Sequence, residues 1–288
     1  MKLISEKTKP LIKKSRRVYR LATAQFRVLP DFIIVGAQKS GTTSLFKYLS
    51  QHPKILHSSP KEILYFDGGT NPKIDNYEKG LNWYRSHFPL RFQMKEGYVT
   101  GEASPLYLFN SKVPGRISKV LPDVKILVLL RNPVDRAISH YFHQVRIGKE
   151  TLPIMEAMTA EASRLEKALK AGNSRDDSFI RYSYKTRGYY KEQLARYFNY
   201  FPRKQILILK SEDLFGKVTT ILEQVFCFLG LDKDVLIKDL QPRNTLNCNK
   251  ELMKQREEIA PEIYRFLEEH FLPYNLKLYD FLEDFCGW

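Results

Sequence analysis

The sequence predicts a single α/β domain in which helices cover both faces of a central parallel sheet. Four short apolar runs lie at Phe32–Val35, Tyr98–Thr100, Val124–Leu130 and Ile206–Leu209. Near-continuous apolar runs are typical of strands that are buried on both faces. Helical patterns lie between and after these runs, and such alternation favours a parallel sheet. The 288 residues suffice for one sizeable domain with a full hydrophobic core.

Six segments are expected to form the helices. Thr43–Ser50 follows the first strand directly. Val134–Arg146 follows Asn132–Pro133, a pair that supplies an N-cap and a proline at the first helical position. The other four are Ile154–Ala171, Tyr189–Tyr200, Thr219–Leu229 and Lys250–His270. We expect a loop at Gly172–Ser178 and no domain boundary within residues 30–288.

Residues 1–29 are predicted to be a basic leader ahead of the domain at 30–288. The leader has nine Lys and Arg residues against Glu6 alone, so eight of the fifteen net positive charges lie there. A large positive excess favours an anionic partner. Because charge runs are usually solvated, we expect a flexible, partly disordered leader. The alternative is a basic helix that makes weak contact with an anionic membrane surface.

Several classes of protein lack their characteristic signals in this sequence. No run approaches the ~20 apolar residues that span a bilayer, and the start lacks the apolar core of a signal peptide. We therefore expect a cytoplasmic location. Three widely spaced cysteines match neither a zinc site nor a disulfide framework. No nucleic-acid-binding motif is found, so a nucleic-acid partner is not expected.

The most informative segment is the one in which the first strand runs through Gly36 and Gly41 into a helix. Exposed N–H groups and the positive dipole end of a helix start create an anion site. The two glycines permit a tight turn and close backbone approach. Lys39 adds a formal charge to this loop. Hydroxyl groups that could donate to an anion follow at Ser40, Thr42, Thr43 and Ser44.

The spacing from Gly36 to Gly41 equals that of a Walker A loop, so a P-loop kinase or another NTPase is an alternative. A Walker loop requires Lys directly after the second Gly, where this chain has Thr42, and its own Lys39 lies inside the loop. The strand Val124–Leu130 ends at Arg131, where a Walker B strand would end in a metal-binding Asp. Both departures favour a phosphate-binding loop that does not serve a kinase.

The loop Lys39-Ser40-Gly41-Thr42-Thr43 resembles the 5'-phosphosulfate-binding loop of sulfotransferases that use 3'-phosphoadenosine-5'-phosphosulfate (PAPS). The segment from Arg131 to Tyr141 resembles that family's 3'-phosphate-binding segment. Further similarity is to the branch that contains the heparan sulfate sulfotransferases and bacterial relatives. It is carried by Ser59–Asp67, Gly101–Tyr107, Gly188–Leu194, Glu212–Leu214 and Phe271–Trp288.

The resemblance implies a PAPS co-substrate, adenosine 3',5'-bisphosphate as product, and no metal requirement. Residues 39–44 would bind the 5'-phosphosulfate. Arg131 and Ser139 would bind the 3'-phosphate, for which Arg131 offers a fork of donors. Tyr190 is expected to line the cleft, and Arg243 to lie in a loop that closes over PAPS.

The same resemblance assigns the catalytic residues. Glu62 would be the general base that accepts the acceptor's proton, and Lys39 would neutralise charge on the leaving phosphate. Lys61 either lowers the pKa of Glu62 or contacts the sulfate. His140 and His143 are alternative proton acceptors, because histidine titrates near neutrality. Three positions apart on a helix, these two histidines are expected to share a face.

Two departures bear on the acceptor. Leu64 stands where the heparan sulfate enzymes commonly have His, and Ala103 where they commonly have Lys. Both changes weaken the case for a highly anionic polysaccharide. We expect transfer to a hydroxyl, or to an amine, on a sugar, lipid or small metabolite. The remaining alternative is a non-enzymatic basic protein that binds nucleic acid or membrane.

Overall fold

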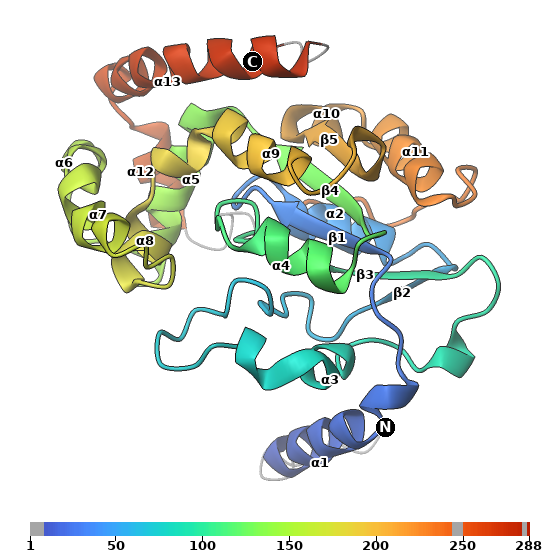
Figure 1. Ribbon diagram of the computed structural model, residues 1–288. Helices are drawn as coiled ribbons and strands as arrows, with labels where there is room; N and C mark the ends of the chain where they lie inside the picture. The colour runs from blue at the N-terminus through green and yellow to red at the C-terminus, as the bar shows by residue number, and fades with distance from the viewer. Residues whose placement is uncertain (1–8, 244–249, 284–286) are drawn as a thin grey trace.

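A five-stranded parallel sheet forms the centre of the molecule (Figure 1). The computed structural model describes residues 9–243, 250–283 and 287–288. The strand order is β2-β3-β1-β4-β5. The strands are β1 (Phe32–Gly36), β2 (Ile55–His57), β3 (Val99–Ala103), β4 (Lys125–Leu130) and β5 (Ile206–Lys210).

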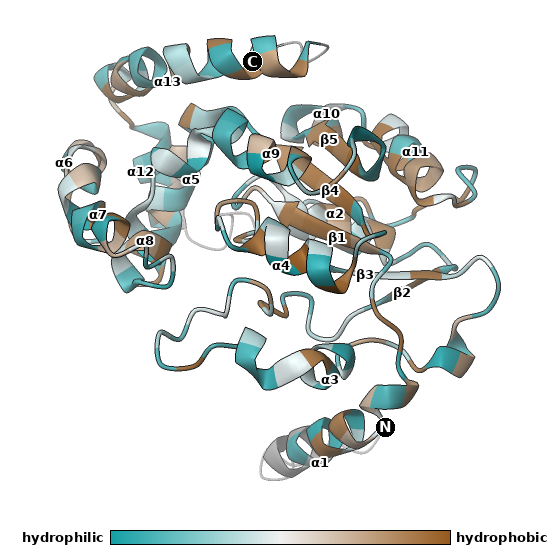
Figure 2. Cartoon of the chain, viewed as in Figure 1, coloured by the Kyte–Doolittle hydropathy of each residue, from teal (hydrophilic) through white to brown (hydrophobic). Residues whose placement is uncertain are grey.

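Both faces of the sheet are buried, as the apolar runs predict. Ile33 and Val35 of β1 pack into one core cluster with residues of α4 (Val113–Val120) and α9 (Tyr190–Phe198). Phe32 and Ile34 point to the other face, where α2 (Thr42–Leu49) and α11 (Val218–Leu229) cover them. Successive side chains of a strand alternate between faces, so a strand that is apolar throughout feeds both layers. Figure 2 shows hydrophobic residues along β1 and β4.

Helices make up most of the remaining chain. Besides α4 and α9, they include α2 (Thr42–Leu49), α5 (Pro133–Arg146), α8 (Asp177–Tyr182), α10 (Ser211–Gly216) and α11 (Val218–Leu229). The others are α1 (Lys9–Ala22), α3 (Gly80–Arg85), α6 (Ile154–Thr159), α7 (Glu161–Lys170), α12 (Lys250–Glu257) and α13 (Pro261–Leu282). A third core cluster joins α5 and α13 beyond the sheet.

The predicted strands and the single α/β domain are confirmed, with boundaries that differ by a few residues. The edge strand β2 was not predicted, and neither were α3, α4, α8 and α10. The predicted helix Ile154–Ala171 is two helices that meet at Ala160. The last predicted helix also divides, because Pro261 starts a new one. The predicted loop Gly172–Ser178 is shorter than expected, because Asp176 caps α8 through the Ser178 N–H.

The described part of the basic leader includes the helix α1 (Lys9–Ala22). Its side chains from Lys14 to Tyr19 are exposed, as expected for a solvated segment. Two arginines tie its C-terminal end to the domain. Arg20 Nε donates to the Ser86 carbonyl at 2.7 Å, and Arg27 Nη1 donates to the Phe88 carbonyl at 2.7 Å. Across the described ranges, no helix combines the length and apolar character that crossing a membrane requires.

Gly101 of β3 is a position where the sheet leaves no room for a side chain. A Cβ atom there would lie 2.5 Å from ring carbons of Phe32 and 2.6 Å from the Phe32 carbonyl oxygen. We predict that Gly101→Ala lowers the free energy of unfolding by about 1–3 kcal/mol through overpacking. Urea denaturation measures this loss. Gly216→Ala is the control, because a Cβ on Gly216 meets no atom within 4 Å; equal losses in the two variants would contradict the packing account.

Candidate active site

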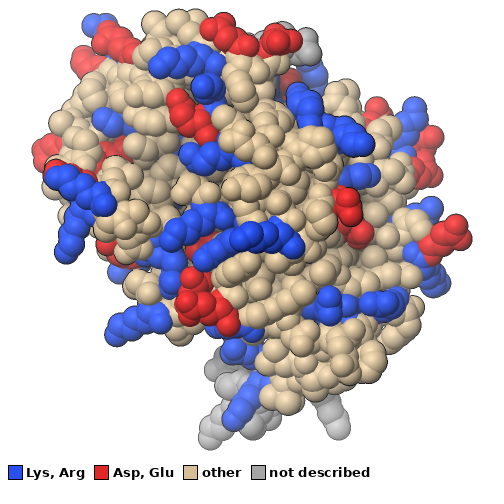
Figure 3. All heavy atoms as spheres, in the orientation of Figure 1, with Lys and Arg blue, Asp and Glu red and all other residues tan. Residues whose placement is uncertain are grey.

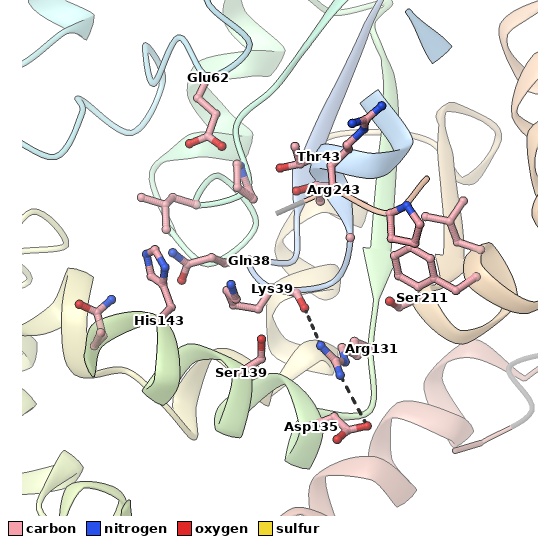
Figure 4. A pocket seen from close by; sticks show the side chains of 18 of the residues that line it. Gln38, Lys39, Thr43, Glu62, Arg131, Asp135, Ser139, His143, Ser211 and Arg243 are labelled. Atoms are coloured by element: carbon pink, nitrogen blue, oxygen red, sulfur yellow. Dashed lines mark hydrogen bonds and ion pairs between the residues drawn. The ribbon is translucent and has the colours of Figure 1, made fainter. Parts of the chain in front are cut away.

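A cavity of about 1240 Å³ lies at the carboxyl ends of the parallel strands. The chain leaves β1 toward β2 and β3 and later crosses to β4 on the opposite side, so the strand order reverses between β1 and β4. Ligands of open α/β sheets bind in the crevice at such a switch point. The residues that follow β1, β3, β4 and β5 all contribute to the cavity wall: Lys39, Pro105, Arg131 and Ser211. Figure 4 shows several of these side chains converging.

The backbone of the loop between β1 and α2 turns so that several residues of the loop and of the first turn of α2 face the cavity. Gly41 adopts a left-handed conformation with φ of 88° at the N-cap of α2. A Cβ there would lie 2.9 Å from the Phe215 ring, so the position requires glycine on two counts. Lys39 also has a positive φ of 72°, which is uncommon for a side chain with a Cβ and is found at functional sites. Lys39, Gly41, Thr42 and Thr43 line the cavity.

Lys39 is the most strongly perturbed cation of the cavity. Burial, followed by the nearby positive charges of Arg146 and Arg131, lowers the pKa of its ammonium group to about 8. Removing a charge from water disfavours the charged form, and neighbouring cations add to this effect. The site is therefore strongly electropositive before any ligand enters. An anion bound here would relieve the repulsion among these groups.

Arg131 connects the two halves of the site. Its Nη1 donates to the Lys39 carbonyl at 3.3 Å, and its Nη2 lies 3.8 Å from a carboxylate oxygen of Asp135 (Figure 4). Behind it, the buried Tyr190 hydroxyl donates to the Arg131 carbonyl at 2.9 Å. Glu212 accepts from the Asn132 N–H at 2.9 Å, and the Asn132 side chain caps α5. These contacts fix the position at which β4 turns into α5.

One side of α5 forms a wall of the cavity. Asp135, Ser139, His143 and Ile147 line it at intervals of four residues. At 1.5 Å per residue, this row extends for about 18 Å. Figure 4 places Asp135 beside Arg131 and His143 beside Gln38, so the row starts at Arg131 and extends along the site.

The two histidines of α5 have different surroundings. Burial and the positive charges of Lys39 and Arg146 lower the pKa of the cavity-lining His143 to about 4. The imidazole is therefore neutral near pH 7, and Arg146 Nη2 lies 3.1 Å from its Nδ1. His140 is fully buried against Tyr184 and does not line the cavity. The expectation that both would serve one face of the site is wrong, because the helix turns His140 into the core.

Glu62 lines the cavity at the end opposite Arg131. Its carboxylate is 2.9 Å from Lys61 Nζ, and the same ammonium group donates to Thr43 Oγ1 at 2.8 Å. The Glu62 side chain is 44% exposed, so solvent and small molecules can reach it. Lys61 thus joins the carboxylate to the first turn of α2, although the residues are far apart in sequence.

A buried carboxylate to which sequence reasoning assigned no role is linked to the segment that follows Glu62. Glu102 of β3 accepts hydrogen bonds from the Tyr84 hydroxyl and from Ser104 Oγ, both at 2.7 Å. Ser104 Oγ in turn accepts from the Leu64 N–H at 3.3 Å, and Leu64 has a positive φ of 54°. Burial raises the pKa of Glu102 to about 7. The network holds the backbone two residues after Glu62 in an unusual conformation.

The structure brings most of the predicted site residues to one cavity. Arg243 lines it, donates its N–H to Ser44 Oγ at 2.9 Å, and pairs with Asp239. Part of its predicted loop, residues 244–247, lies outside the described residues. Ser40 and Ser44 are buried and Tyr190 belongs to the core, so these three side chains do not line the cavity.

Sequence reasoning missed several residues of the wall. Gln38, Arg181 and Arg256 line the cavity, the last two from helices that are distant in sequence. No local sequence pattern marks Arg181 and Arg256, because tertiary packing alone brings these two side chains to the cavity. Ser211 could have been found, since it directly follows a parallel strand at the edge where ligands bind. Within the described ranges, no group of three His, Cys, Asp or Glu side chains could hold a metal ion.

The chain is similar to several known sulfotransferases. A crystal structure of a sulfotransferase from Alicyclobacillus acidocaldarius has a TM-score of 0.66 and 29% identity, covering 90% of this chain and 98% of that one. The membrane-associated sulfotransferase kil1 of Dictyostelium discoideum is 26% identical. The human heparan sulfate glucosamine 3-O-sulfotransferase 3B1 is 29% identical. Each of these two matches covers 90% of this chain but only 66% and 65%, respectively, of the relative.

The model of the sulfotransferase domain family matches residues 29–273, which include every strand of the sheet and all the cavity-lining residues discussed above. The chain therefore belongs to the sulfotransferase domain family.

Proposed function

We propose that this sulfotransferase moves a sulfuryl group from PAPS to a hydroxyl-bearing acceptor, with Glu62 as general base. The observation that carries the proposal is the pair of cationic groups at adjacent strand ends, Lys39 after β1 and Arg131 after β4. They are linked through the hydrogen bond from Arg131 to the Lys39 carbonyl. A nucleotide with phosphates on both sides of its ribose requires two anion sites within one cavity.

The donor fits along the wall formed by α5. The N–H groups at the start of α2, with the Thr42 and Thr43 hydroxyls, suit the 5'-phosphosulfate. Arg131 and Ser139 suit the 3'-phosphate. Arg243 would contact the nucleotide from the opposite wall. Tyr190 would act indirectly, because its hydroxyl holds the Arg131 carbonyl and its ring stays in the core.

The transfer itself needs in-line positioning, charge stabilisation on the leaving group and removal of one proton. The acceptor oxygen attacks sulfur while the bond between sulfur and the bridging phosphate oxygen breaks. Glu62 takes the proton of the acceptor hydroxyl. Lys39 and the start of α2 stabilise the negative charge that develops on the leaving phosphate. Lys61 orients Glu62 through its contacts with that carboxylate and with Thr43.

His143 ranks below Glu62 as the base because the family resemblance assigns that role to Glu62. With its pKa lowered to about 4, its imidazole has little affinity for a proton at neutral pH. A neutral imidazole can still orient the acceptor by a hydrogen bond. His140 has no path to the acceptor, since it is buried away from the cavity.

The acceptor is proposed to be an uncharged hydroxyl compound, such as a sugar. Leu64 and Leu106 line the cavity on the side of Glu62, and Arg181 is paired with Asp177 at 2.6 Å. Ala103 is buried and does not reach the cavity. The human relative's name states a glucosamine 3-O acceptor, which is consistent with a sugar hydroxyl. A cytoplasmic location remains a prediction.

Two positions in the sequence disfavour the kinase alternative. Thr42 follows the second glycine, where a P-loop kinase has its lysine, and β4 is followed by Arg131 in place of a metal-binding carboxylate.

The lowered pKa of Lys39 predicts a pH dependence of donor binding. A bound phosphate favours the charged ammonium, so the affinity for adenosine 3',5'-bisphosphate should fall as the pH rises above about 8, approaching tenfold per pH unit. Calorimetric titration from about pH 7 to about pH 9.5 measures this slope. Lys39→Arg stays charged over that range and should give a flat profile. Equal slopes in the wild type and the variant would refute the role of Lys39.

Replacing the proposed base, Glu62, distinguishes an effect on donor binding from an effect on the rate of sulfuryl transfer. Glu62→Gln should bind adenosine 3',5'-bisphosphate as the wild type does, but transfer sulfate roughly 10²–10⁴-fold more slowly. The assay follows the release of the bisphosphate from PAPS and the formation of sulfated product across a panel of sugar and alcohol acceptors.

Glu78→Gln is the matched control, since Glu78 is exposed and lies outside the cavity lining. Wild-type rates in Glu62→Gln would exclude Glu62 as the base. Failure of the wild type to turn over PAPS with every acceptor in the panel would contradict the proposed function itself.

A further inference from the structure

We propose that α1 and the adjoining edge of the domain form a docking surface for an anionic lipid bilayer. The surface, called here the N-terminal face, consists of exposed apolar and basic side chains of residues 14–26 and 91–95. Its members are Lys14, Arg16, Arg17, Val18, Tyr19, Leu21, Phe26, Arg91, Phe92 and Lys95. This inference does not depend on the proposed sulfuryl transfer.

The first observation is that α1 is amphipathic. Val18 and Ala22 are four residues apart and share a side of the helix, and Tyr19 lies between that side and the side of Arg16. Arg16 and Arg20, which are also four apart, lie on the opposite side. A helix of this kind would normally bury its apolar side against a core. Here Val18 and Tyr19 are 60% and 55% exposed, so the domain leaves the apolar side uncovered.

The second observation is that two exposed aromatic rings lie on the segments next to the end of the helix. An isolated antiparallel bridge pairs Arg27 with Leu90, and it brings the segments around Phe26 and Phe92 together. These two rings are 59% and 81% exposed. Isolated exposed apolar residues need no explanation, but a continuous group of them marks an interaction site. Aromatic rings are favoured at the boundary between lipid and water.

The third observation is the charge around these apolar groups. Lys14, Arg16 and Arg17 on α1, and Arg91 and Lys95 beside Phe92, are all exposed. No carboxylate among the described residues forms an ion pair with any of these five side chains. Figure 3 shows Lys and Arg side chains over the visible face of the molecule, interspersed with Asp and Glu.

This combination fits a lipid surface better than other occupants. Nucleic acid would satisfy the cations but would leave Val18 and Phe92 in water. A second copy of the chain would bring two basic helices together, and their like charges would repel. An anionic bilayer accepts both kinds of group, because apolar side chains enter the acyl boundary while the cations contact the headgroups.

Because α1 is attached to the domain, the orientation of the helix on a bilayer also determines the orientation of the domain. Arg20 donates to the Ser86 carbonyl and Arg27 to the Phe88 carbonyl, so the helix end is fixed to the segment after α3. A bilayer bound to the N-terminal face would therefore orient the whole domain. In Figure 1, α1 and α3 lie together at one end of the molecule.

Vesicle sedimentation of the full chain tests the proposal. The probes are phosphatidylcholine vesicles with and without phosphatidylglycerol, at low and high salt. We expect binding that requires phosphatidylglycerol and weakens with salt. Arg16→Glu with Arg17→Glu should weaken binding by about tenfold or more, because each cation near an anionic surface contributes to attachment. Phe92→Ser should weaken binding while leaving its salt dependence unchanged.

Matched controls lie after α11. Lys233→Glu with Lys238→Glu makes the same change in charge on other exposed lysines, and Leu236→Ser removes an apolar side chain that is 82% exposed. Both should bind vesicles as the wild type does, and circular dichroism verifies folding of every variant. Absence of phosphatidylglycerol-dependent binding would overturn the proposal. Equal losses in the controls would do so too, as would a dimer that Phe92→Ser dissociates in the absence of vesicles.

Discussion

The hydrogen bond between the Arg131 guanidinium and the Lys39 carbonyl is the contact on which the site depends. It joins the loop after β1 to the end of β4, across the point where the strand order reverses. Parallel pairing of β1 with β4 fixes the spacing of the two groups. Tyr190 supports this pair from the core, and α5 extends from it along the wall.

Electrostatic repulsion is the cost of this arrangement. Lys39 lies near Arg131 and Arg146, and burial, followed by the surrounding positive charges, lowers the pKa values of both Lys39 and His143. Such a site is destabilising for the protein alone and favourable once phosphate groups enter, because bound anions neutralise cations that burial has deprived of water. The same burial and positive charges keep His143 neutral. Glu62 lines the same cavity and is paired with its own cation, Lys61.

Much of the fold was predictable from sequence, because strands that are buried on both faces consist almost entirely of apolar residues. The apolar runs of β1, β4 and β5 and the capped start of α5 carry that signal. The strand β2 escaped notice because it has three residues at the edge of the sheet, and its exposure increases toward His57. The break at Ala160 was also hidden, since helical periodicity continues across it.

The candidate site was predictable where its residues are close in sequence and unpredictable elsewhere. Arg131 was identified because it directly follows β4, and Lys39 because it lies in the glycine-containing loop between β1 and α2. The link from Lys61 to Thr43 spans 18 positions, and no spacing rule contains it. The buried Glu102 looked like part of a family motif, and only packing showed that its carboxylate supports the backbone near Glu62. Which of His140 and His143 faces the cavity depends on how α5 rotates against the core.

The most direct test of the central claim is a calorimetric titration without metal. Adenosine 3',5'-bisphosphate and ATP are titrated into the wild type and into Arg131→Ala. The account predicts tight binding of the bisphosphate to the wild type, a large loss in Arg131→Ala, and weaker binding of ATP, which lacks the 3'-phosphate. If ATP with Mg²⁺ bound and the bisphosphate did not, the paired anion sites would not serve PAPS, and the account would be wrong.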